Sequence, residues 1–355
     1  MLYLKPFSIA LVASIILTFF IRKIALKLNV TAPKGDRHIH KKTVPLFGGV
    51  AMIFAFILAI LSTKELVISR ELFGMLLGFG IILIVGIWDD IKEISWRIQL
   101  FFQFILALII IAFGVRVDYL TNPFGGAIRL DQIQFSVLNS SALFGTNFEF
   151  SVFGSLFIIF WIVGMINVFN WLDGIDGLSG GVGVIGAVVL FFLCLNPIVD
   201  QPPIAILAIA FVGAVLGFLV FNFPPAKIFM GTSGSMFLGF TLGTLAIFSG
   251  AKIATAVLVM GFPILDGFWV IVQRLKSGVS PFKGDKRHLH YKLISLGFSQ
   301  RQIILLIYFL CGSFGTAALF LQSIGKLIAL LFLVASMILV AFVVSWFLGR
   351  KKELS

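Results

Sequence analysis

Four polar segments interrupt an otherwise apolar chain, and each carries side chains that can bind a phosphate or a metal ion. Carboxylate and amide oxygens are the ligands that Mg²⁺ prefers, whereas basic side chains and backbone amides suit a diphosphate. Together they predict a site that handles phosphates with a divalent cation. The segments are GIWDDIKEISWR at 86–97, NVFNWLDGIDGL at 167–178, FNFPPAKIFMGTSGS at 221–235 and SPFKGDKRHLHYKL at 280–293.

Each segment taken alone also has a purely structural interpretation. Adjacent acids such as Asp89 and Asp90 are often a solvated helix end. The glycines of GIDGLSGG can permit a tight turn, and GTSGS can be either a helix start or a backbone cradle for an anion. His288 and His290 can be basic residues at a membrane surface. The functional interpretation therefore depends on the four segments converging.

The elements that must position these segments are membrane-spanning helices. The 355 residues are 60% hydrophobic, with a mean hydropathy of +1.11, and only 12% are charged. Soluble domains carry about 25% charged residues. Hydrocarbon cannot satisfy free backbone groups, so we expect an all-α, polytopic membrane protein forming one domain over residues 1–355. Eleven spans are predicted, at 7–28, 46–63, 72–88, 97–114, 153–170, 180–196, 203–221, 233–249, 253–272, 302–321 and 327–348.

The distribution of basic residues predicts the orientation of these spans. With the N-terminus outside and the C-terminus in the cytoplasm, 20 of the 27 Lys and Arg residues lie on the cytoplasmic side. All four polar segments then share the cytoplasmic face. The net charge of +12 is explained by that face and by anionic lipid headgroups, so no nucleic-acid partner is expected. A small outward hairpin is predicted near residues 115–152.

One acid, Asp266, lies inside a predicted span. Ionisable groups at membrane depth are costly and indicate function by default. An ion-coupled transporter is therefore the alternative from a different functional class. Transporter sites lie near the middle of the membrane, however, whereas nearly all candidate groups here lie on the cytoplasmic side. The two cysteines, Cys194 and Cys311, fall in apolar runs and are interpreted as packing residues.

At these motifs the chain resembles the polyprenyl-phosphate N-acetylhexosamine-1-phosphate transferases of the glycosyltransferase 4 family, which are related to phospho-N-acetylmuramoyl-pentapeptide transferase. The resemblance covers most of the chain. It includes the basic loop APKGDRHIHKKTVPLFGG with Pro45, Gly48 and Gly49, and it continues in GIWDD, NVFNWLDGIDGL, PPAKIFMG, PILDGFW and DKRHLHYKL.

The resemblance implies transfer of N-acetylhexosamine-1-phosphate from a UDP-sugar to undecaprenyl phosphate, with release of UMP. UDP-N-acetylglucosamine is the favoured donor, because DKRHLHY is similar to the short form of the motif. A muramoyl-pentapeptide donor is the alternative within the family. The implied cofactor is Mg²⁺, with Mn²⁺ as a substitute. The implied location is the bacterial inner membrane, with the site on the cytoplasmic face, and the oligomeric state stays open between a monomer and a homodimer.

The resemblance also assigns roles to residues of this chain. The catalytic candidates are Asp89, Asp90, His288 and His290, and the metal candidates are Asn170, Asp173 and Thr232. The candidates for substrate binding are Lys42, Asn167, Asp173, Asp176, Lys227, Asp285 and Arg287.

Two positions depart from the family pattern. Tyr291 replaces one imidazole of the histidine motif, and Thr232 stands where the family has an aspartate that would ligate magnesium. A neutral hydroxyl is a weaker Mg²⁺ ligand than a carboxylate. Three explanations stay open: a neighbouring acid substitutes, the chain is a weak or inactive member, or the residue is an engineered change.

Overall fold

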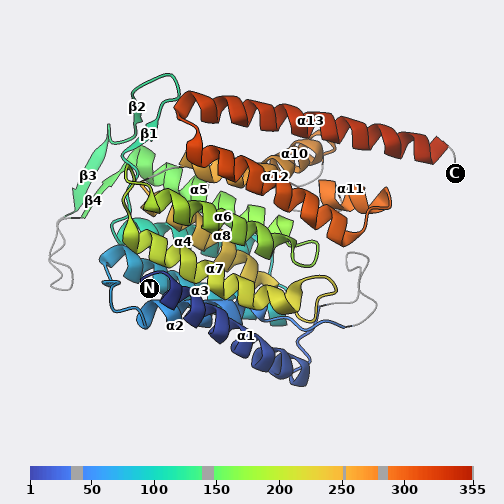
Figure 1. Cartoon of the computed structure of the whole chain (residues 1–355), viewed down its shortest axis with the longest axis horizontal. Coiled ribbons are helices and arrows are strands. Elements are labelled where there is room, and N and C mark those ends of the chain that lie inside the picture. The colour runs from blue at the N-terminus through green and yellow to red at the C-terminus, as the bar shows by residue number, and fades with distance from the viewer. Residues whose placement is uncertain (33–42, 138–147, 251–252, 279–286, 354–355) are drawn as a thin grey trace.

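The computed structural model of the chain describes residues 1–32, 43–137, 148–250, 253–278 and 287–353, and it shows a bundle of helices (Figure 1). The longer helices are α1 (Leu4–Lys27), α2 (Gly48–Leu61), α3 (Arg70–Ile91), α4 (Trp96–Ala112), α5 (Val152–Leu172), α6 (Leu178–Leu195), α7 (Pro202–Asn222), α8 (Gly231–Phe248), α10 (Gly261–Lys276), α12 (Gln300–Phe320) and α13 (Ser323–Glu353). Two short helices of seven residues complete the bundle, α9 (Ile253–Val259) and α11 (Leu289–Ser295).

Every predicted span contains a helix, which confirms the all-α membrane fold. In the described part of the chain, eight helices are long and apolar enough to cross a membrane, and a ninth span arises if the pair α9 and α10 counts as one. The shorter helices α2 and α4 have 14 and 17 residues and coincide with the second and fourth predicted spans. The chain is therefore a multi-pass membrane protein, while the number of eleven crossings stays a prediction.

The predicted span 253–272 is not one continuous helix. It consists of α9 and α10, which are bent by 77° relative to each other at Met260. Pro263 explains the break, because it has no N–H to donate to the carbonyl of Val259, four residues earlier. The bend gives α10 its own direction in the bundle, and α10 contains Asp266.

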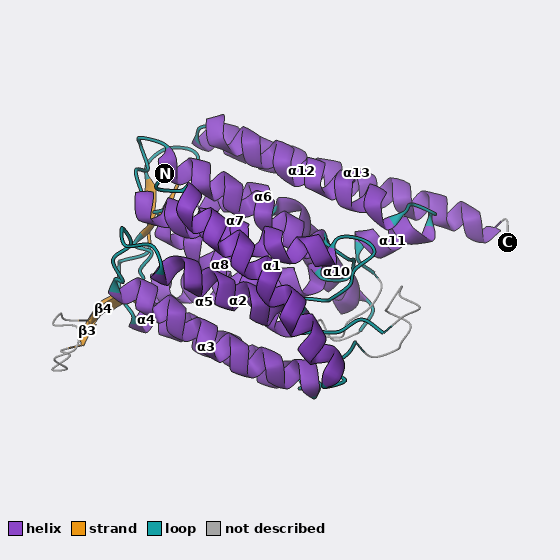
Figure 2. Cartoon of the chain, turned by 60° about the horizontal axis from the view of Figure 1, so that its bottom comes forward, coloured by secondary structure: helices purple, strands orange, loops and turns teal. Residues whose placement is uncertain are grey.

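The region of the predicted hairpin contains two antiparallel pairs of short strands. Strand β1 (Tyr119–Thr121) pairs with β2 (Ala127–Arg129), with Tyr119 opposite Arg129. Strand β3 (Gln134–Val137) pairs with β4 (Phe148–Ser151). Both pairs lie at one end of the bundle, the hairpin end, in Figures 1 and 2.

The first three polar segments and the described part of the fourth, residues 287–293, lie at the opposite end, the polar end. Figures 1 and 2 show the loop after α3 and the turns around α8 and α11 on the side away from the strands. The N- and C-termini also lie toward opposite ends, as an odd number of crossings requires. The structure thus brings together the groups that the charge distribution predicts to share one membrane face.

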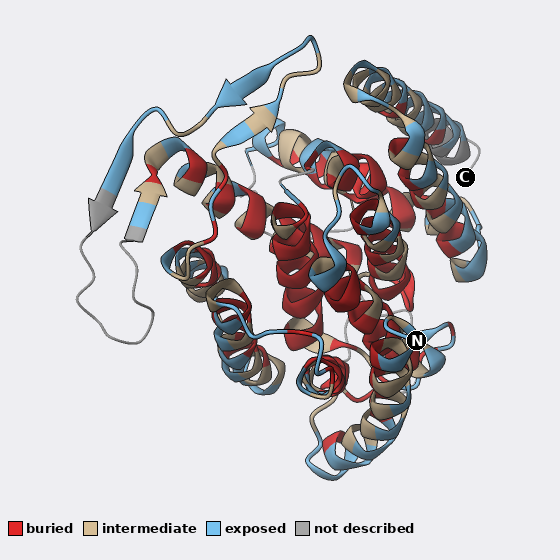
Figure 3. Ribbon diagram, turned by 60° about the vertical axis from the view of Figure 1, so that its left-hand side comes forward, coloured by how far each residue is buried: buried red, intermediate tan, exposed pale blue. Residues whose placement is uncertain are grey.

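Helix α8 is the centre of the bundle, and it packs against α5, α3 and α2. It has the lowest mean hydropathy of the candidate spans, 1.3, yet 83% of its residues from Gly231 to Phe248 are buried. By contrast, α13 has a hydropathy of 3.2 and is 11% buried. Figure 3 shows this distribution, with buried residues in the central helices and exposed ones on the outer faces. The Gly, Ser and Thr residues of α8 therefore face protein, and the most apolar helix faces outward.

Glycine allows α3 to approach α8 closely. A Cβ atom added at Gly86 would collide with the backbone of Ser233, whereas one added at Gly80, also in α3, would meet nothing within 4 Å. Ser233 is fully buried beside the polar segment of α8. The spacing of these two helices therefore depends on the missing side chain at position 86.

We predict that Gly86→Ala destabilises the protein, by about 1–3 kcal/mol as for other overpacked cores. The reason is that α3 and α8 must separate to accommodate the methyl group. The measurement is the apparent unfolding temperature in detergent. Gly80→Ala is the matched control and should leave this temperature unchanged or raise it. Equal temperatures for both variants would contradict the close packing.

Candidate active site

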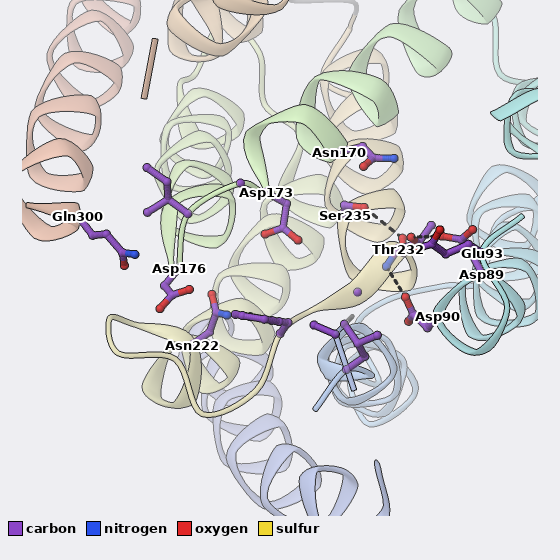
Figure 4. A pocket seen from close by; sticks show the side chains of 16 residues that line it. Asp89, Asp90, Glu93, Asn170, Asp173, Asp176, Asn222, Thr232, Ser235 and Gln300 are labelled. Atoms are coloured by element: carbon purple, nitrogen blue, oxygen red, sulfur yellow. Dashed lines mark hydrogen bonds between the residues drawn. The ribbon is translucent and has the colours of Figure 1, made fainter. Parts of the chain in front are cut away.

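A cavity of about 270 Å³ opens at the polar end, between residues that are far apart in the sequence. Small-molecule sites have volumes of roughly 300–1,000 Å³, so this one is at the lower limit of that range. Figure 4 shows the acidic side chains from α3 and from the turn after α5 directed into the same space. The polar lining residues are Asp89, Asp90, Glu93, Asn170, Asp173, Asp176, Asn222, Thr232, Ser235 and Gln300.

The end of α3 is joined to the start of α8 by Asp90. Its carboxylate accepts a hydrogen bond of 2.8 Å from the backbone N–H of Thr232, and one of 3.3 Å from the Ser233 hydroxyl. The first N–H groups of a helix have no partner within the helix, so Asp90 caps α8 from another element. Gly231 has a φ of +69°, and a side chain there would collide with the Asp90 carboxylate. Glycine at this position is therefore required for the cap.

Asp89 and Asp90 have different partners, although they are adjacent in sequence. Asp89 accepts hydrogen bonds from the backbone N–H of Ile94 at 2.9 Å and from the side chain of Gln99 at 3.0 Å. Its second oxygen accepts a short hydrogen bond from the hydroxyl of Thr232. Thr232 thus bonds to both acids, through its hydroxyl to one and through its amide to the other (Figure 4).

The turn between α5 and α6 contributes Asp173 and Asp176. Asp173 follows the last residue of α5 and accepts a hydrogen bond of 2.8 Å from Ser179. Removal from water raises the pKa of Asp173 to about 7, although the hydrogen bond from Ser179 opposes this shift. Asp176 is buried and accepts a hydrogen bond of 2.9 Å from the backbone N–H of Ala226. Asp173 therefore faces the cavity, whereas Asp176 also fixes the loop before α8.

Two backbone segments are tied together beneath the cavity. Phe229 donates to the carbonyl of Pro45 at 2.8 Å, and Gly48 and Gly49 donate to the carbonyls of Phe229 and Met230 at 2.9 and 2.8 Å. An added side chain at Gly48 would collide with Phe218 of α7 and with the Phe229 carbonyl, and one at Gly49 would collide with the backbone of Gly234 in α8. The segment with Pro45, Gly48 and Gly49 thus holds the backbone that leads into Thr232.

Neither His288 nor His290 lines the cavity. His290 is buried next to Gly174, a lining residue, and its Nε2 atom has no hydrogen-bond partner within the described residues. Burial lowers the pKa of His290 to about 4, so the ring is neutral near pH 7. His288 is buried as well, and its Nδ1 atom lies 2.8 Å from Asp266.

The other predicted residues lie outside the cavity or outside the described part of the chain. Asn167 donates hydrogen bonds to Gln103 and to the carbonyl of Val163. Lys227 has an exposed side chain on the loop that leads to α8. Arg287 donates to Gln273 and Ser277 of the α10 end. Lys42 and Asp285 fall outside the described residues. The binding roles of these residues stay predictions.

The structure adds polar groups that the sequence patterns did not single out. Ser179 holds Asp173, and Asn222 fixes the α7–α8 loop by accepting from the Gly177 amide and donating to the Ile228 carbonyl, both at 2.9 Å. Gln300 enters the cavity from α12 (Figure 4). Asn222 was detectable as a polar residue in the FNFPP segment, whereas Gln300 gives no such signal because its neighbours in sequence form an ordinary helix start.

The side chains in the cavity offer the type of ligand atom that a hard divalent cation prefers. Asp89, Asp173 and Asn170 all present oxygen atoms. Within the described residues no three Asp, Glu, His or Cys side chains form a metal cluster by themselves. Mg²⁺ characteristically uses only one or two carboxylates and completes its shell with water and substrate phosphates. The site therefore suits Mg²⁺ together with a phosphate-bearing ligand.

Comparison with known proteins gives consistent relatives over nearly the whole chain. Residues 72–250 match the family described as glycosyl transferase family 4. A probable undecaprenyl-phosphate N-acetylglucosaminyl 1-phosphate transferase of Bacillus subtilis is 28% identical, with 89% of this chain and 84% of the relative aligned. A decaprenyl-phosphate N-acetylglucosaminephosphotransferase of Mycolicibacterium smegmatis is 30% identical, over 89% and 82%. A phospho-N-acetylmuramoyl-pentapeptide-transferase of Bacillus subtilis is 31% identical, over 91% and 95%.

The raised pKa of Asp173 predicts how the metal-free protein responds to pH. Between pH 3.8 and about 7 the folded state keeps a proton that the unfolded state releases, so this residue lowers the free energy of unfolding as the pH rises through that window. In EDTA, Asp173→Asn should therefore become more stable relative to the unmodified protein from pH 5 to pH 8. The measurement is the unfolding temperature, with the exposed Glu65→Gln as control. A constant difference across this range would contradict the prediction.

Proposed function

The chain belongs to glycosyl transferase family 4, and on this basis we propose that it transfers N-acetylhexosamine-1-phosphate from a UDP-sugar to undecaprenyl phosphate and releases UMP. The observation that carries this proposal is the convergence of Asp89, Asp173 and Thr232 at one cavity at the polar end of a membrane bundle. A nucleotide sugar is soluble and a polyprenyl phosphate is held in the membrane. A site at the end of the helices is where the two can meet.

The proposed reaction takes place between the polyprenyl phosphate and the nucleotide sugar. A phosphate oxygen of the lipid attacks the sugar-proximal phosphorus of the UDP-sugar, forming a new P–O bond as the bond to UMP breaks. Positioning and charge neutralisation provide most of the acceleration in phosphoryl transfer. Asp89 and Asp90 orient the reacting region, and their bonds to Thr232 keep both carboxylates in place. His290 lies next to Gly174 of the cavity and His288 stacks on His290, so these two rings are our candidates for contacts with phosphate groups.

We propose Mg²⁺ as the cofactor, with Mn²⁺ as a substitute. Asn170 and Asp173 would hold it, with Asp89 as the neighbouring acid that takes over from the family aspartate at position 232. When bound, the cation neutralises charge on the diphosphate. The hydroxyl of Thr232 donates a hydrogen bond to Asp89, so in this chain it fixes the position of the Asp89 carboxylate.

Among donors, UDP-N-acetylglucosamine is our choice. Two of the relatives are named for N-acetylglucosamine-phosphate transfer and one for the muramoyl pentapeptide, so the latter is the second candidate. The short DKRHLHY motif favours the simple sugar. The product would be a lipid-linked sugar on the cytoplasmic face of the bacterial inner membrane, as in the first membrane step of an envelope polysaccharide such as teichoic acid or lipopolysaccharide.

Purified protein supplied with undecaprenyl phosphate, Mg²⁺ and one radiolabelled UDP-sugar at a time tests the proposal. We expect labelled lipid and an equal amount of UMP with UDP-N-acetylglucosamine, and no product with Asp90→Asn. Labelled lipid only with the muramoyl-pentapeptide donor would replace our choice of donor. Uptake of substrate into liposomes without UMP would favour the transporter alternative.

The residue at position 232 should set the metal requirement. Thr232→Asp adds a carboxylate beside Asp89 and Asp90, so the Mg²⁺ concentration for half-maximal UMP release should fall by about tenfold, equivalent to ~1.4 kcal/mol. Thr232→Val keeps the volume but removes the hydroxyl that bonds to Asp89, and it should not lower this concentration. An identical Mg²⁺ midpoint and rate for Thr232→Asp and the unmodified protein would refute the role of this position.

A further inference from the structure

Asp266 is a buried acid that the proposed reaction does not use. It lies in the second turn of α10, just beyond the bend at Met260, and its relative exposure is 6%. Burying a carboxylate is costly unless hydrogen bonds or an opposite charge compensate. Its partners therefore indicate what it does.

Asp266 bonds to two consecutive residues of another element. Its Oδ2 atom lies 2.8 Å from Nδ1 of His288, and its Oδ1 atom accepts a hydrogen bond of 2.9 Å from the backbone N–H of Leu289. Leu289 is the first residue of α11, so one oxygen caps this helix and the other holds the imidazole that precedes it. The two contacts together fix the ring relative to the backbone.

The His288 ring is also enclosed by other rings. The ring of His290 is stacked on it at a centroid distance of 5.5 Å, with an angle of 8° between the planes. Trp171 of α5 is 6.4 Å away. A side chain at Gly267 would meet the Trp171 ring at 2.8 Å, so this glycine lets Trp171 approach α10 beside Asp266. The imidazole therefore has little freedom to turn over.

We propose that Asp266 is a positioning residue that keeps a proton on Nδ1 of His288, so that any contact of this ring with a phosphate is made through Nε2. This role rests on the proposed function. A carboxylate that accepts from Nδ1–H selects one tautomer of the ring, as carboxylates hydrogen-bonded to metal-binding histidines do. Asp266 affects the reaction through His288, because it does not line the cavity at the polar end and its carboxylate bonds to His288 and to the backbone of Leu289.

The opposite assignment is a protonated Asp266 that donates to a bare Nδ1. A buried acid can be neutral, and the distance of 2.8 Å fits both arrangements. The two assignments place the proton on different atoms, so a spectrum that reports the protonation of the ring nitrogens separates them.

Solid-state NMR of the full chain labelled with ¹⁵N-histidine makes this measurement without any activity. The chain has four histidines, and His288→Gln assigns the signal of interest. We expect a protonated Nδ1 in the unmodified protein and a bare Nδ1 in Asp266→Asn, whose amide can still accept from Leu289 while its NH₂ group faces the ring. A bare Nδ1 in the unmodified protein would overturn the assignment, even if the chain proved to have another reaction.

A double-mutant cycle then tests whether Asp266 acts through His288. Asp266→Asn should lower kcat for UMP release about 10–100-fold, as loss of the carboxylate that orients a metal-binding histidine does elsewhere, with little change in KM. In the His288→Gln background the same substitution should add less than a further twofold loss. Equal losses in both backgrounds would show a structural role independent of the imidazole and would overturn the proposal. Failure of every UDP-sugar to react would instead count against the proposed function and leave the NMR result decisive.

Discussion

The polar end depends on one recurring interaction, in which a partly or fully buried carboxylate accepts a backbone N–H group of a different segment. Asp90 caps α8, Asp176 accepts from Ala226 and Asp266 caps α11. Backbone N–H groups at a helix start have no partner inside the helix, and a mainly apolar bundle offers little water to replace one. Asp90 and Asp176 can therefore hold their positions at the cavity without a bound cation, and Asp266 holds the start of α11.

Glycine makes these contacts sterically feasible. Gly231 leaves room for the Asp90 carboxylate, Gly49 approaches the backbone of Gly234, and Gly86 approaches Ser233. Apolar burial does not drive helices together within lipid, so close backbone packing and hydrogen bonds provide much of the association. The small residues thus set the geometry of the acids as well as the packing of the core.

Thr232 shows how the hydrogen bonds of the acids change when a threonine replaces the aspartate that the family pattern has at this position. Its amide keeps the bond to Asp90 that any residue at this position could make, while its hydroxyl adds a bond to Asp89. A carboxylate here would bring three negative groups together and would favour a cation more strongly. With Thr232 the cavity carries less negative charge than it would with an aspartate at this position. Any metal ion bound here would therefore depend more on the oxygen atoms of Asp173 and Asn170.

The sequence by itself determined the membrane class, the helical regions and the motifs whose acids meet in the cavity, because hydropathy and residue type are local properties. Asp89, Asp90, Asn170, Asp173 and Asp176 stood out by residue type, Thr232 stood out by its departure from the pattern of the resembling family, and all six line one cavity. The 77° angle between α9 and α10, the entry of Gln300 and the pairing of Asp266 with His288 were decided only by the tertiary structure. These features depend on which helices pack together and at what angle, and the partners lie on helices whose local sequence carries no record of their neighbours.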